Sequence, residues 1–527
     1  MDFDSFLYQL HFDTDNIYPP NWQVDWEDAP LPYKRYSDLR AVPLSIEVPL
    51  TLKRQEAHLN PSLEELGHFL WYIYGLSQYS QTAIMDESVE KNVRFTGSLR
   101  RFVPSGGALY PNELYVYVKL DDVPNGIYHY DVAHHRLVLL REGNFDSYLS
   151  RSLANDRSVS DCFCTVFVTT VFWKNFYKYN NFSYRLQGLD AGVLIGQTLE
   201  VANTLGYSTK VCYQFLDRSI NHLLGLSQQK ESVYAVIPIS MKPSITQDDY
   251  LQRKEETVSA SQLCREIPEL NHVSYNRSKK VLDYPMLRKL NEASMIETTK
   301  SFVKIMKKAE QKPLLNTEMV LLPFTERSSY DLADVCQKRY SPDIDFMLGK
   351  VSQTQLSTLL KEIYSFPYQN DLDDTEGQIG NRLSLYGSFY NIEGVPNGAY
   401  SYDNRTHAIR RLTKGDHREY LQSGLTMPNV NLYQVPLCMH VVGDRDHLIE
   451  KLGYRGYRIQ QMEAGILVQR MLLVACALGM GGHPLLGFDA NQCDELYRIN
   501  SKGKTSLIQV PVGPYRPRAW LRGSLLS

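Results

Sequence analysis

Two short runs in the first part of the sequence carry residues that could do chemistry. The first is Pro104-Ser105-Gly106-Gly107, a turn without bulky side chains, whose backbone could approach a flat ring closely. Arg100 and Arg101 stand just before it and offer guanidinium groups to a phosphate or a ring carbonyl. The alternative is an ordinary surface loop before an edge strand.

The second run is Lys178-Tyr179, which follows an expected buried strand and precedes an expected long helix, a common place for active-site residues. A lysine acts as a general base only if its pKa falls, through burial or a nearby cation. Lys174 and the aromatic residues between 172 and 177 would favour such a fall, and Tyr179 could relay or orient the proton. Taken alone, the pair is better explained by a solvated lysine beside a core tyrosine.

The chain contains an internal repeat. Residues 125–131 resemble 397–403 at an offset of 272, and residues 184–206 resemble 457–479 at an offset of 273. Several matches in the same order, at nearly one offset, indicate two homologous domains in tandem.

Each copy has the same expected elements, and these must position the two runs. A helix with apolar residues at helical spacing comes first, at 66–73 and 356–363, and strands, a long helix and a last strand follow. The expected strands are 114–118, 126–130, 164–171, 233–237, 435–442 and 507–510, and the long helices are 184–205 and 457–478. This mixture predicts an α+β fold. We expect a first domain at 1–245, a helical connector at 246–316 and a second domain at 317–527.

Composition is that of a soluble globular protein. Apolar residues make up 43% and charged residues 22%, and a net charge of −3 gives no global field that would attract nucleic acid. The acidic start lacks the layout of a secretory signal, and the apolar stretch 464–480 carries Gln469 and Arg470, so we expect no membrane span. Eight scattered cysteines without a ligand pattern predict reduced thiols in a cytoplasmic protein, and no metal site.

The two runs together resemble the nitroreductase superfamily, and specifically its SagB/McbC-type azoline dehydrogenases. The resemblance rests on Arg100-Arg101-Phe-Val-Pro104-Ser105-Gly106-Gly107-Ala-Leu-Tyr-Pro111 and on Lys178-Tyr179-Asn-Asn-Phe-Ser-Tyr184-Arg185, and it covers both halves. Those enzymes use FMN to mature peptides that carry thiazoles and oxazoles. The resemblance implies two nitroreductase-like domains, a bound FMN, and a proton-handling role for Lys178 and Tyr179. Ser105 would then donate to an oxygen of the cofactor.

The two copies complement each other. The second copy keeps the lysine, as Lys451, but has Leu452 in place of the tyrosine, and it lacks the Pro-Ser-Gly-Gly run. It alone resembles the remaining flavin segments of the superfamily, which are Arg327 and Ser329 near its start, Leu486 and Gly487 after its long helix, and Arg516 and Arg518 near its end. Nitroreductases are usually homodimers with FMN at the interface. The resemblance therefore implies a covalent pseudo-dimer with one FMN site between its halves.

The expected function is the FMN-dependent oxidation of thiazoline or oxazoline rings in a ribosomally made precursor peptide. The resemblance implies two partners, a YcaO-type cyclodehydratase and a leader-binding protein. An NAD(P)H-dependent nitro- or quinone reductase is the first alternative, and a non-catalytic scaffold of the peptide-modifying complex is the second. The sequence leaves open the peptide, the preferred ring, the final electron acceptor and any higher homo-oligomer.

Overall fold

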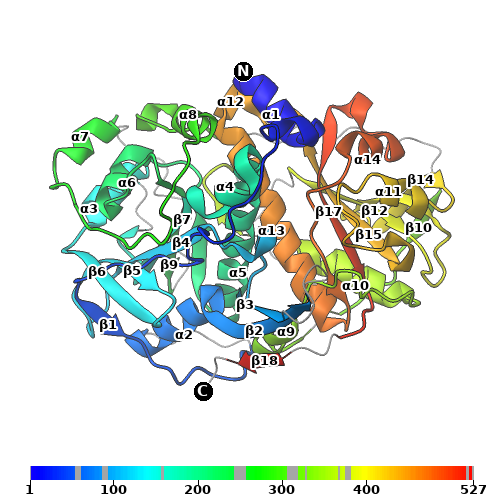
Figure 1. Ribbon diagram of the computed structural model, residues 1–527, viewed down its shortest axis with the longest axis horizontal. Coiled ribbons are helices and arrows are strands. Elements are labelled where there is room, and N and C mark those ends of the chain that lie inside the picture. The colour runs from blue at the N-terminus through cyan, green and yellow to red at the C-terminus, as the bar shows by residue number, and fades with distance from the viewer. Residues whose placement is uncertain are drawn as a thin grey trace.

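The computed structural model describes residues 2–53, 61–85, 93–155, 159–241, 257–305, 318–326, 329–365, 368–373, 382–517 and 521–524, with the backbone alone for 82–85, 93–96 and 521–524. Figure 1 shows two halves side by side, with two long helices, α5 (Ser183–Thr204) and α13 (Arg455–Ala477), between them. Each half has one large sheet, so the expected α+β class with two similar domains is confirmed.

The sheet of the first half has the order β1-β6-β5-β4-β7-β9-β8, and β11 of the second half extends it beyond β8. Its own strands pair antiparallel, whereas β11 lies parallel to β8. These strands are β1 (Ala41–Pro43), β4 (Asn112–Val118), β5 (Gly126–Asp131), β6 (Arg136–Glu142), β7 (Cys164–Val171), β8 (Ser208–Val211), β9 (Glu231–Ser240) and β11 (Gln369–Asn370).

The second sheet repeats this order strand for strand, as β10-β14-β13-β12-β15-β17-β16. Its strands are β10 (Met319–Leu321), β12 (Ser384–Phe389), β13 (Gly398–Asp403), β14 (Ala408–Lys414), β15 (Leu437–Asp444), β16 (Gly481–Gly482) and β17 (Lys504–Gly513). The repeat seen in the sequence is therefore a repeat of topology.

The helices repeat as well. The early helix of each copy begins with the same capping box, Ser62 with Glu65 in α2 and Ser352 with Gln355 in α10. Besides α5 and α13, the α-helices of the described residues are α1 (Phe3–Phe12), α2 (Leu63–Tyr74), α3 (Asp146–Ser152), α4 (Trp173–Tyr179), α6 (Asp217–Leu224), α7 (Ala260–Cys264), α8 (Pro285–Ala293), α9 (Leu332–Lys338), α10 (Gln353–Tyr364), α11 (Arg418–Ser423), α12 (Ile449–Leu452) and α14 (Ala490–Leu496). The expected connector contributes α7 and α8 to the described residues.

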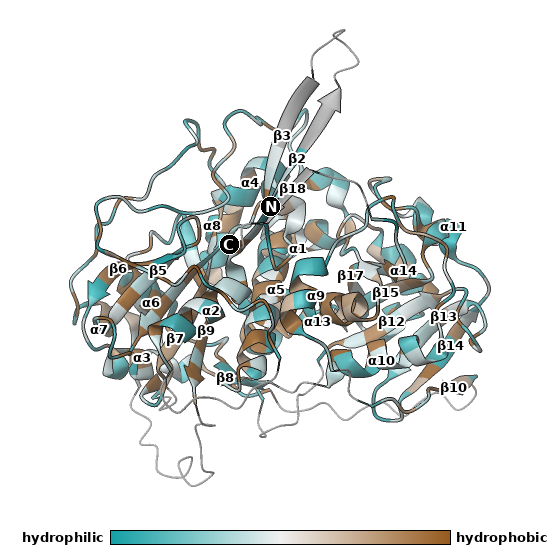
Figure 2. Ribbon diagram, turned by 90° about the horizontal axis from the view of Figure 1, so that it is seen from below, coloured by the Kyte–Doolittle hydropathy of each residue, from teal (hydrophilic) through white to brown (hydrophobic). Residues whose placement is uncertain are grey.

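The two long helices join the halves. A Cβ atom on Gly192 of α5 would lie 2.0 Å from the carbonyl oxygen of Met462, and one on Gly465 of α13 would lie 2.4 Å from that of Leu189. The backbones can approach this closely only because both residues are glycines. Tyr184 and Tyr457, which occupy equivalent positions, stack with their ring centroids 6.0 Å apart. In Figure 2 the apolar colour gathers on these helices in the middle of the molecule.

Each half also reaches onto the other. The last strand of the chain, β18 (Leu521–Ser524), pairs with β2 (Leu76–Met85), which forms a hairpin with β3 (Val93–Arg101) (Figure 2). At the other end, α1 packs on the second half, where the imidazole of His11 lies 3.0 Å from the hydroxyl of Thr505. The expected domain boundaries at 245 and 316 remain a prediction.

All eight cysteines are thiols, and six of them are buried. No helix in the described part of the chain is long and apolar enough to cross a membrane. Within the same residues, no group of three or more His, Cys, Asp or Glu side chains could hold a metal ion.

Candidate functional site

The Pro-Ser-Gly-Gly loop follows β3 directly and is held by a carboxylate of α5. The hydroxyl of Ser105 donates to Asp190 Oδ2 at 2.7 Å, and the amide of Gly106 donates to Asp190 Oδ1 at 3.2 Å. The Ser105 hydroxyl also accepts a hydrogen bond from the amide of Tyr110, at 2.9 Å. These contacts fix a tight loop in which Gly107 has a φ of 64°, a conformation suited to glycine. In this structure Ser105 donates to Asp190, so the loop offers a ligand chiefly its backbone.

Lys178 and Tyr179 form the last turn of α4 and face this loop. A Cβ atom on Gly107 would lie 2.8 Å from Lys178 Nζ and 2.6 Å from the Tyr179 hydroxyl. The structure thus brings the two predicted runs together, although 70 residues separate them in the chain. We call Gly107, Lys178, Tyr179 and Asp190 the Lys178 cluster.

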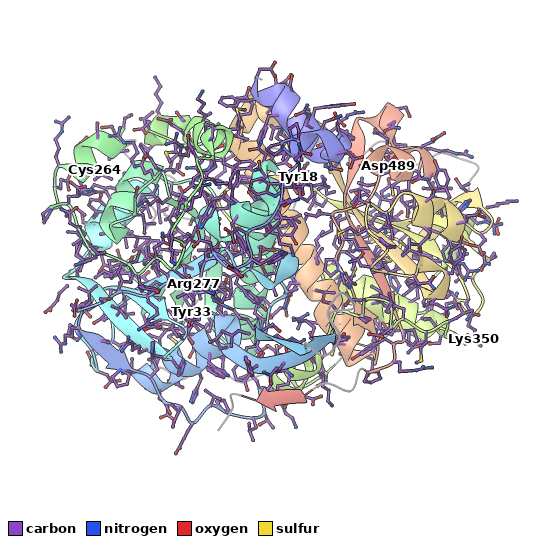
Figure 3. All side chains as sticks on the ribbon, viewed as in Figure 1. Tyr18, Tyr33, Cys264, Arg277, Lys350 and Asp489 are labelled. Carbon is purple, nitrogen blue, oxygen red and sulfur yellow. The ribbon has the colours of Figure 1, made fainter. Side chains whose placement is uncertain are left out.

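The N-terminal segment covers the Lys178 cluster from outside. The indole of Trp22 donates to the backbone carbonyl of Lys178 at 3.1 Å, and the ammonium lies over the Trp26 ring, 5.3 Å from its centroid. Tyr18, labelled in Figure 3, belongs to the same segment, and its ring centroid lies 6.5 Å from that of Phe182. The lysine is therefore half-buried among aromatic rings.

This burial shifts the pKa of each acid and base in the cluster. Burial lowers the pKa of Lys178, which enlarges the neutral fraction that can act as a base. Burial and the charge of Asp190 together raise the pKa of Tyr179. Burial raises the pKa of Asp190 to about 7, while its bonds to Ser105 and Gly106 oppose the rise.

The sequence also suggested Lys174 as a cation that would lower the pKa of Lys178, and this part was wrong. The ammonium of Lys174 is bound to the buried carboxylate of Glu113, and it donates to the carbonyl of Tyr110 at 3.2 Å. Burial alone lowers the pKa of Lys178. Lys174 instead anchors the end of the loop.

Arg100 and Arg101 differ in their surroundings. The guanidinium of Arg101 is fully buried, donates to the carbonyl of Pro32 at 2.5 Å and lies 3.8 Å from the Tyr74 ring centroid. Arg100 is half-buried and reaches Gln78 across the β2–β3 hairpin at 3.4 Å. This geometry gives Arg101 a structural role in supporting the loop. Contact with a phosphate stays a prediction, and the half-buried Arg100 is better placed for it.

The predicted residues of the second half lie on three separate segments. Ser329 and Arg516 are exposed, Leu486 is buried, and Gly487 packs against Thr426. Asp489, which caps α14 two residues after Gly487, is labelled on the second half in Figure 3. Arg327 and Arg518 fall outside the described residues.

Two segments of the second half, α9 and the C-terminal strand β18, contact the first half near the loop. Arg339, which ends α9, is buried, and its Nε donates to the carbonyl of Phe102 at 3.0 Å, two residues before Pro104. At the start of α9, Asp331 accepts from the amide of Leu52 at 2.9 Å. From Arg516 the chain continues to β18, on the hairpin whose other strand, β3, leads into the loop. The segments that follow Ser329 and Arg516 therefore both reach the first half close to the loop.

The equivalent place in the second half is built differently. Lys451 is exposed there, next to Leu452. Glu463, which corresponds to Asp190, accepts from Arg382 Nε at 2.8 Å, and Arg382 also reaches Asp373 at 2.5 Å. In the first half, Asp190 holds the loop. Its counterpart in the second half, Glu463, is instead neutralised by Arg382.

Sequence reasoning missed several members of this site. Asp190 stands a few residues after the Lys-Tyr run, but its contact with the loop depends on which face of α5 meets the loop. Arg339 has no recognisable spacing to any motif. Trp22 and Trp26 lie more than 150 residues before Lys178, and no pattern in the sequence indicates that contact.

The family model described as the nitroreductase family matches residues 76–239 and 399–514, which together make up more than half of the chain. The matched segments contain the loop, the Lys-Tyr pair and both long helices.

Two curated relatives are peptide-processing proteins. The chain is 30% identical over 155 residues to the trifolitoxin-processing protein TfxB of Rhizobium leguminosarum bv. trifolii, a match that covers 28% of this chain and 42% of that protein. It is 29% identical over 141 residues to the microcin B17-processing protein McbC of Escherichia coli, covering 25% and 51% respectively. The chain thus spans about half the length of these relatives.

The solved structure of a putative nitroreductase from Anabaena variabilis has the same fold over the whole molecule. The TM-score is 0.74 at 20% sequence identity, and the match covers 97% of this chain and 99% of the other. The expected fold is confirmed in both halves. On the family model and the duplicated fold together, the chain belongs to the nitroreductase family.

Proposed function

We propose that this protein is an FMN-dependent azoline dehydrogenase, which oxidises thiazoline or oxazoline rings in a peptide to thiazoles or oxazoles. One observation carries the proposal: Lys178 Nζ and the Tyr179 hydroxyl converge on Gly107 of the loop. The likeness to two peptide-processing proteins supports a peptide as the substrate.

The residues present fit a flavin. Because Gly107 has no side chain, Lys178 Nζ and the Tyr179 hydroxyl can come close to the loop backbone, and a planar ring that lay against this backbone would meet both groups. Ser329 and Arg516 are exposed, as residues that receive a phosphate must be, and each lies on a segment that continues to the first half. Charge-assisted hydrogen bonds from such residues would hold the phosphate.

The chemistry requires a base next to a hydride acceptor. When bound, FMN supplies the acceptor for the hydride that leaves the ring carbon adjacent to Cα. Lys178, in its neutral form, takes the proton from the ring Cα, so the ring loses one hydride and one proton and becomes aromatic. Tyr179 keeps its proton, because its pKa is raised, and it can hold the substrate or the lysine by donating a hydrogen bond.

The asymmetry of the halves supports a single site. The second half offers an exposed lysine without a tyrosine, and an arginine neutralises its equivalent carboxylate. We propose one flavin per chain, with the loop from the first half and the phosphate contacts from the second. A YcaO-type cyclodehydratase would supply the cyclised peptide, and a leader-binding partner would present it.

Mass spectrometry of a cyclised precursor peptide, incubated with and without the protein, tests the proposal. We expect a loss of two hydrogens per ring with the wild type and the Lys451→Ala variant, and a far smaller extent of this loss with Lys178→Ala in the same reaction time. A protein that leaves the rings unchanged and is reduced rapidly by NAD(P)H is a nitro- or quinone reductase. A protein that purifies without flavin and leaves the rings unchanged is a scaffold.

A further inference from the structure

Asp190 is a buried carboxyl group that has no cationic partner among the described residues. It lies on α5 in the middle of the molecule (Figure 1), is 8% exposed, and accepts hydrogen bonds from the Ser105 hydroxyl and the Gly106 amide. Several other buried carboxylates are bound by a Lys or Arg side chain, as in the pairs Glu113–Lys174, Glu231–Lys34 and Glu463–Arg382. A buried carboxylate that no cation neutralises is costly, so such a group readily takes up a proton.

None of the titratable side chains around Asp190 neutralises it. Those in the described residues are Tyr179 and Lys178 of α4, Tyr74 of α2, Arg101 of β3 and Tyr110 of the loop. Burial raises the pKa of Tyr179 and of Tyr74, so neither carries a charge near pH 7. Lys178 meets the loop at Gly107, and Arg101 donates to the carbonyl of Pro32. From the second half, α13 meets this turn of α5 through Met462 and Gly465, which carry no charge.

The charge on Asp190 decides where the proton of the Ser105 hydroxyl lies. A serine hydroxyl has one proton to donate and two lone pairs that accept. One lone pair accepts from the amide of Tyr110 at 2.9 Å. A charged Asp190 can only accept, so the hydroxyl proton lies in the 2.7 Å bond to Asp190 Oδ2. In this state the Ser105 hydroxyl has no proton left to donate to a ligand.

A proton on Asp190 reverses this bond while the two oxygen atoms stay in place. The protonated carboxyl group donates to the second lone pair of the Ser105 hydroxyl, and its other oxygen still accepts from the Gly106 amide. The Ser105 proton is then free to turn away from Asp190, toward the partly exposed side of the loop. There it can be donated to a ligand atom that accepts hydrogen bonds, such as a carbonyl oxygen or a ring nitrogen.

We propose that Asp190 is a positioning residue that acts through Ser105: when Asp190 carries a proton, the Ser105 hydroxyl donates to the flavin, and when Asp190 is charged, that donor is withdrawn. The inference rests on the proposed function for the identity of the ligand. Because flavin prefers the protonated form, binding takes up a proton from solvent, and the affinity falls as the pH rises. Burial raises the pKa of Asp190 to about 7, which places this fall just above neutral pH.

The test measures the affinity of the full chain for FMN at pH 7 and at pH 9, from the quenching of flavin fluorescence. Between these values the flavin phosphate keeps its charge, because its second pKa is about 6. One hydrogen bond of this kind changes an affinity by roughly tenfold, and about half of the chains carry the proton at pH 7. We therefore expect the wild type to bind FMN roughly fivefold more weakly at pH 9 than at pH 7.

Two variants separate this role from a merely structural one. In Asp190→Asn the side-chain amide donates to Ser105 and its oxygen accepts from Gly106, so the variant reproduces the protonated state at every pH. It should bind FMN equally well at pH 7 and pH 9, and more tightly than the wild type at pH 9. A carboxylate that only holds the loop predicts weaker binding by this variant, because an amide nitrogen cannot accept from Ser105. Ser105→Ala removes the donor and should bind FMN weakly at both pH values.

The matched control is Asp494→Asn, the same change at a second buried carboxyl group, whose pKa burial also raises and which accepts from the amide of Ser506 at 2.7 Å. It should keep the pH dependence of the wild type. Equal affinity of the wild type at pH 7 and pH 9, or weaker binding by Asp190→Asn than by the wild type at pH 9, overturns the inference and leaves the proposed function standing. The expected pattern in a protein that does not oxidise rings supports the inference and refutes the proposed function. A chain that binds no FMN at either pH overturns both.

Discussion

Replacing Gly107 by alanine tests the geometry of the Lys178 cluster most sharply. The new methyl carbon would lie 2.6 Å from the Tyr179 hydroxyl and 2.8 Å from Lys178 Nζ. Ordinary contact begins at about 3.4 Å, so both groups must retreat by roughly 0.6–0.8 Å. Each is the far end of a long side chain and can move. The variant should therefore fold, with its base and phenol displaced.

The substitution has two separable effects. A left-handed backbone in a residue other than glycine costs about 1–2 kcal/mol of stability. A displacement approaching 1 Å in a catalytic group lowers the rate by up to about a hundredfold. We expect Gly107→Ala to keep most of its stability and to oxidise azoline rings roughly ten to a hundred times more slowly than the wild type.

The assay is single-turnover oxidation of a cyclised peptide, followed by flavin absorbance, together with a thermal melt. Gly503→Ala is the matched control, because Gly503 also has a φ of 64° and its Cβ would meet no described atom within 4 Å. This control should lose similar stability and no activity. A Gly107→Ala variant that oxidises rings at the wild-type rate would refute the placement of Lys178 and Tyr179 in front of the loop.

Three further predictions follow from the same contacts. Lys178→Ala should lower ring oxidation by about 10²- to 10⁴-fold with flavin still bound, whereas Lys451→Ala should leave the rate unchanged; the reverse pattern in steady-state rates would assign catalysis to the other half. Because folding raises the pKa of Asp190 to about 7 from near 4 in an unfolded chain, the folded protein loses stability as the pH rises through this window. Asp190→Asn should flatten that part of the profile in thermal melts from pH 4 to pH 8, and an unchanged slope would contradict the shift. Arg382→Ala should destabilise the protein by about 3–5 kcal/mol in urea titrations, because Glu463 stays buried without its partner, and should leave the rate of ring oxidation intact.

The sequence predicted the elements that repeat and the runs that carry unusual residues. The expected strand at 164–171 is β7, and the expected helix at 184–205 is α5, displaced by one residue. These succeeded because buried strands and long helices have strong periodic patterns, and because two copies confirm each other.

Contacts between distant segments could not be read from the sequence in the same way. The pairing of β18 with β2 and the cover of Lys178 by Trp22 depend on how the halves pack. Arg101 is an example. An arginine next to a glycine-rich turn suggests an anion site, but the burial of Arg101 against Tyr74 and Pro32 depends on tertiary packing, which the sequence pattern does not show. The same applies to Lys174, which Glu113 binds from another strand.

The ratio of flavin to protein tests most directly the claim of one composite site. It is obtained from the absorbance of flavin released by heating the purified, flavin-saturated chain. The structure predicts a ratio near one, because the loop exists only in the first half and Arg382 neutralises the equivalent carboxylate in the second. A ratio near two would show that both halves bind flavin, and a ratio near zero would show that neither does; either result would contradict the account.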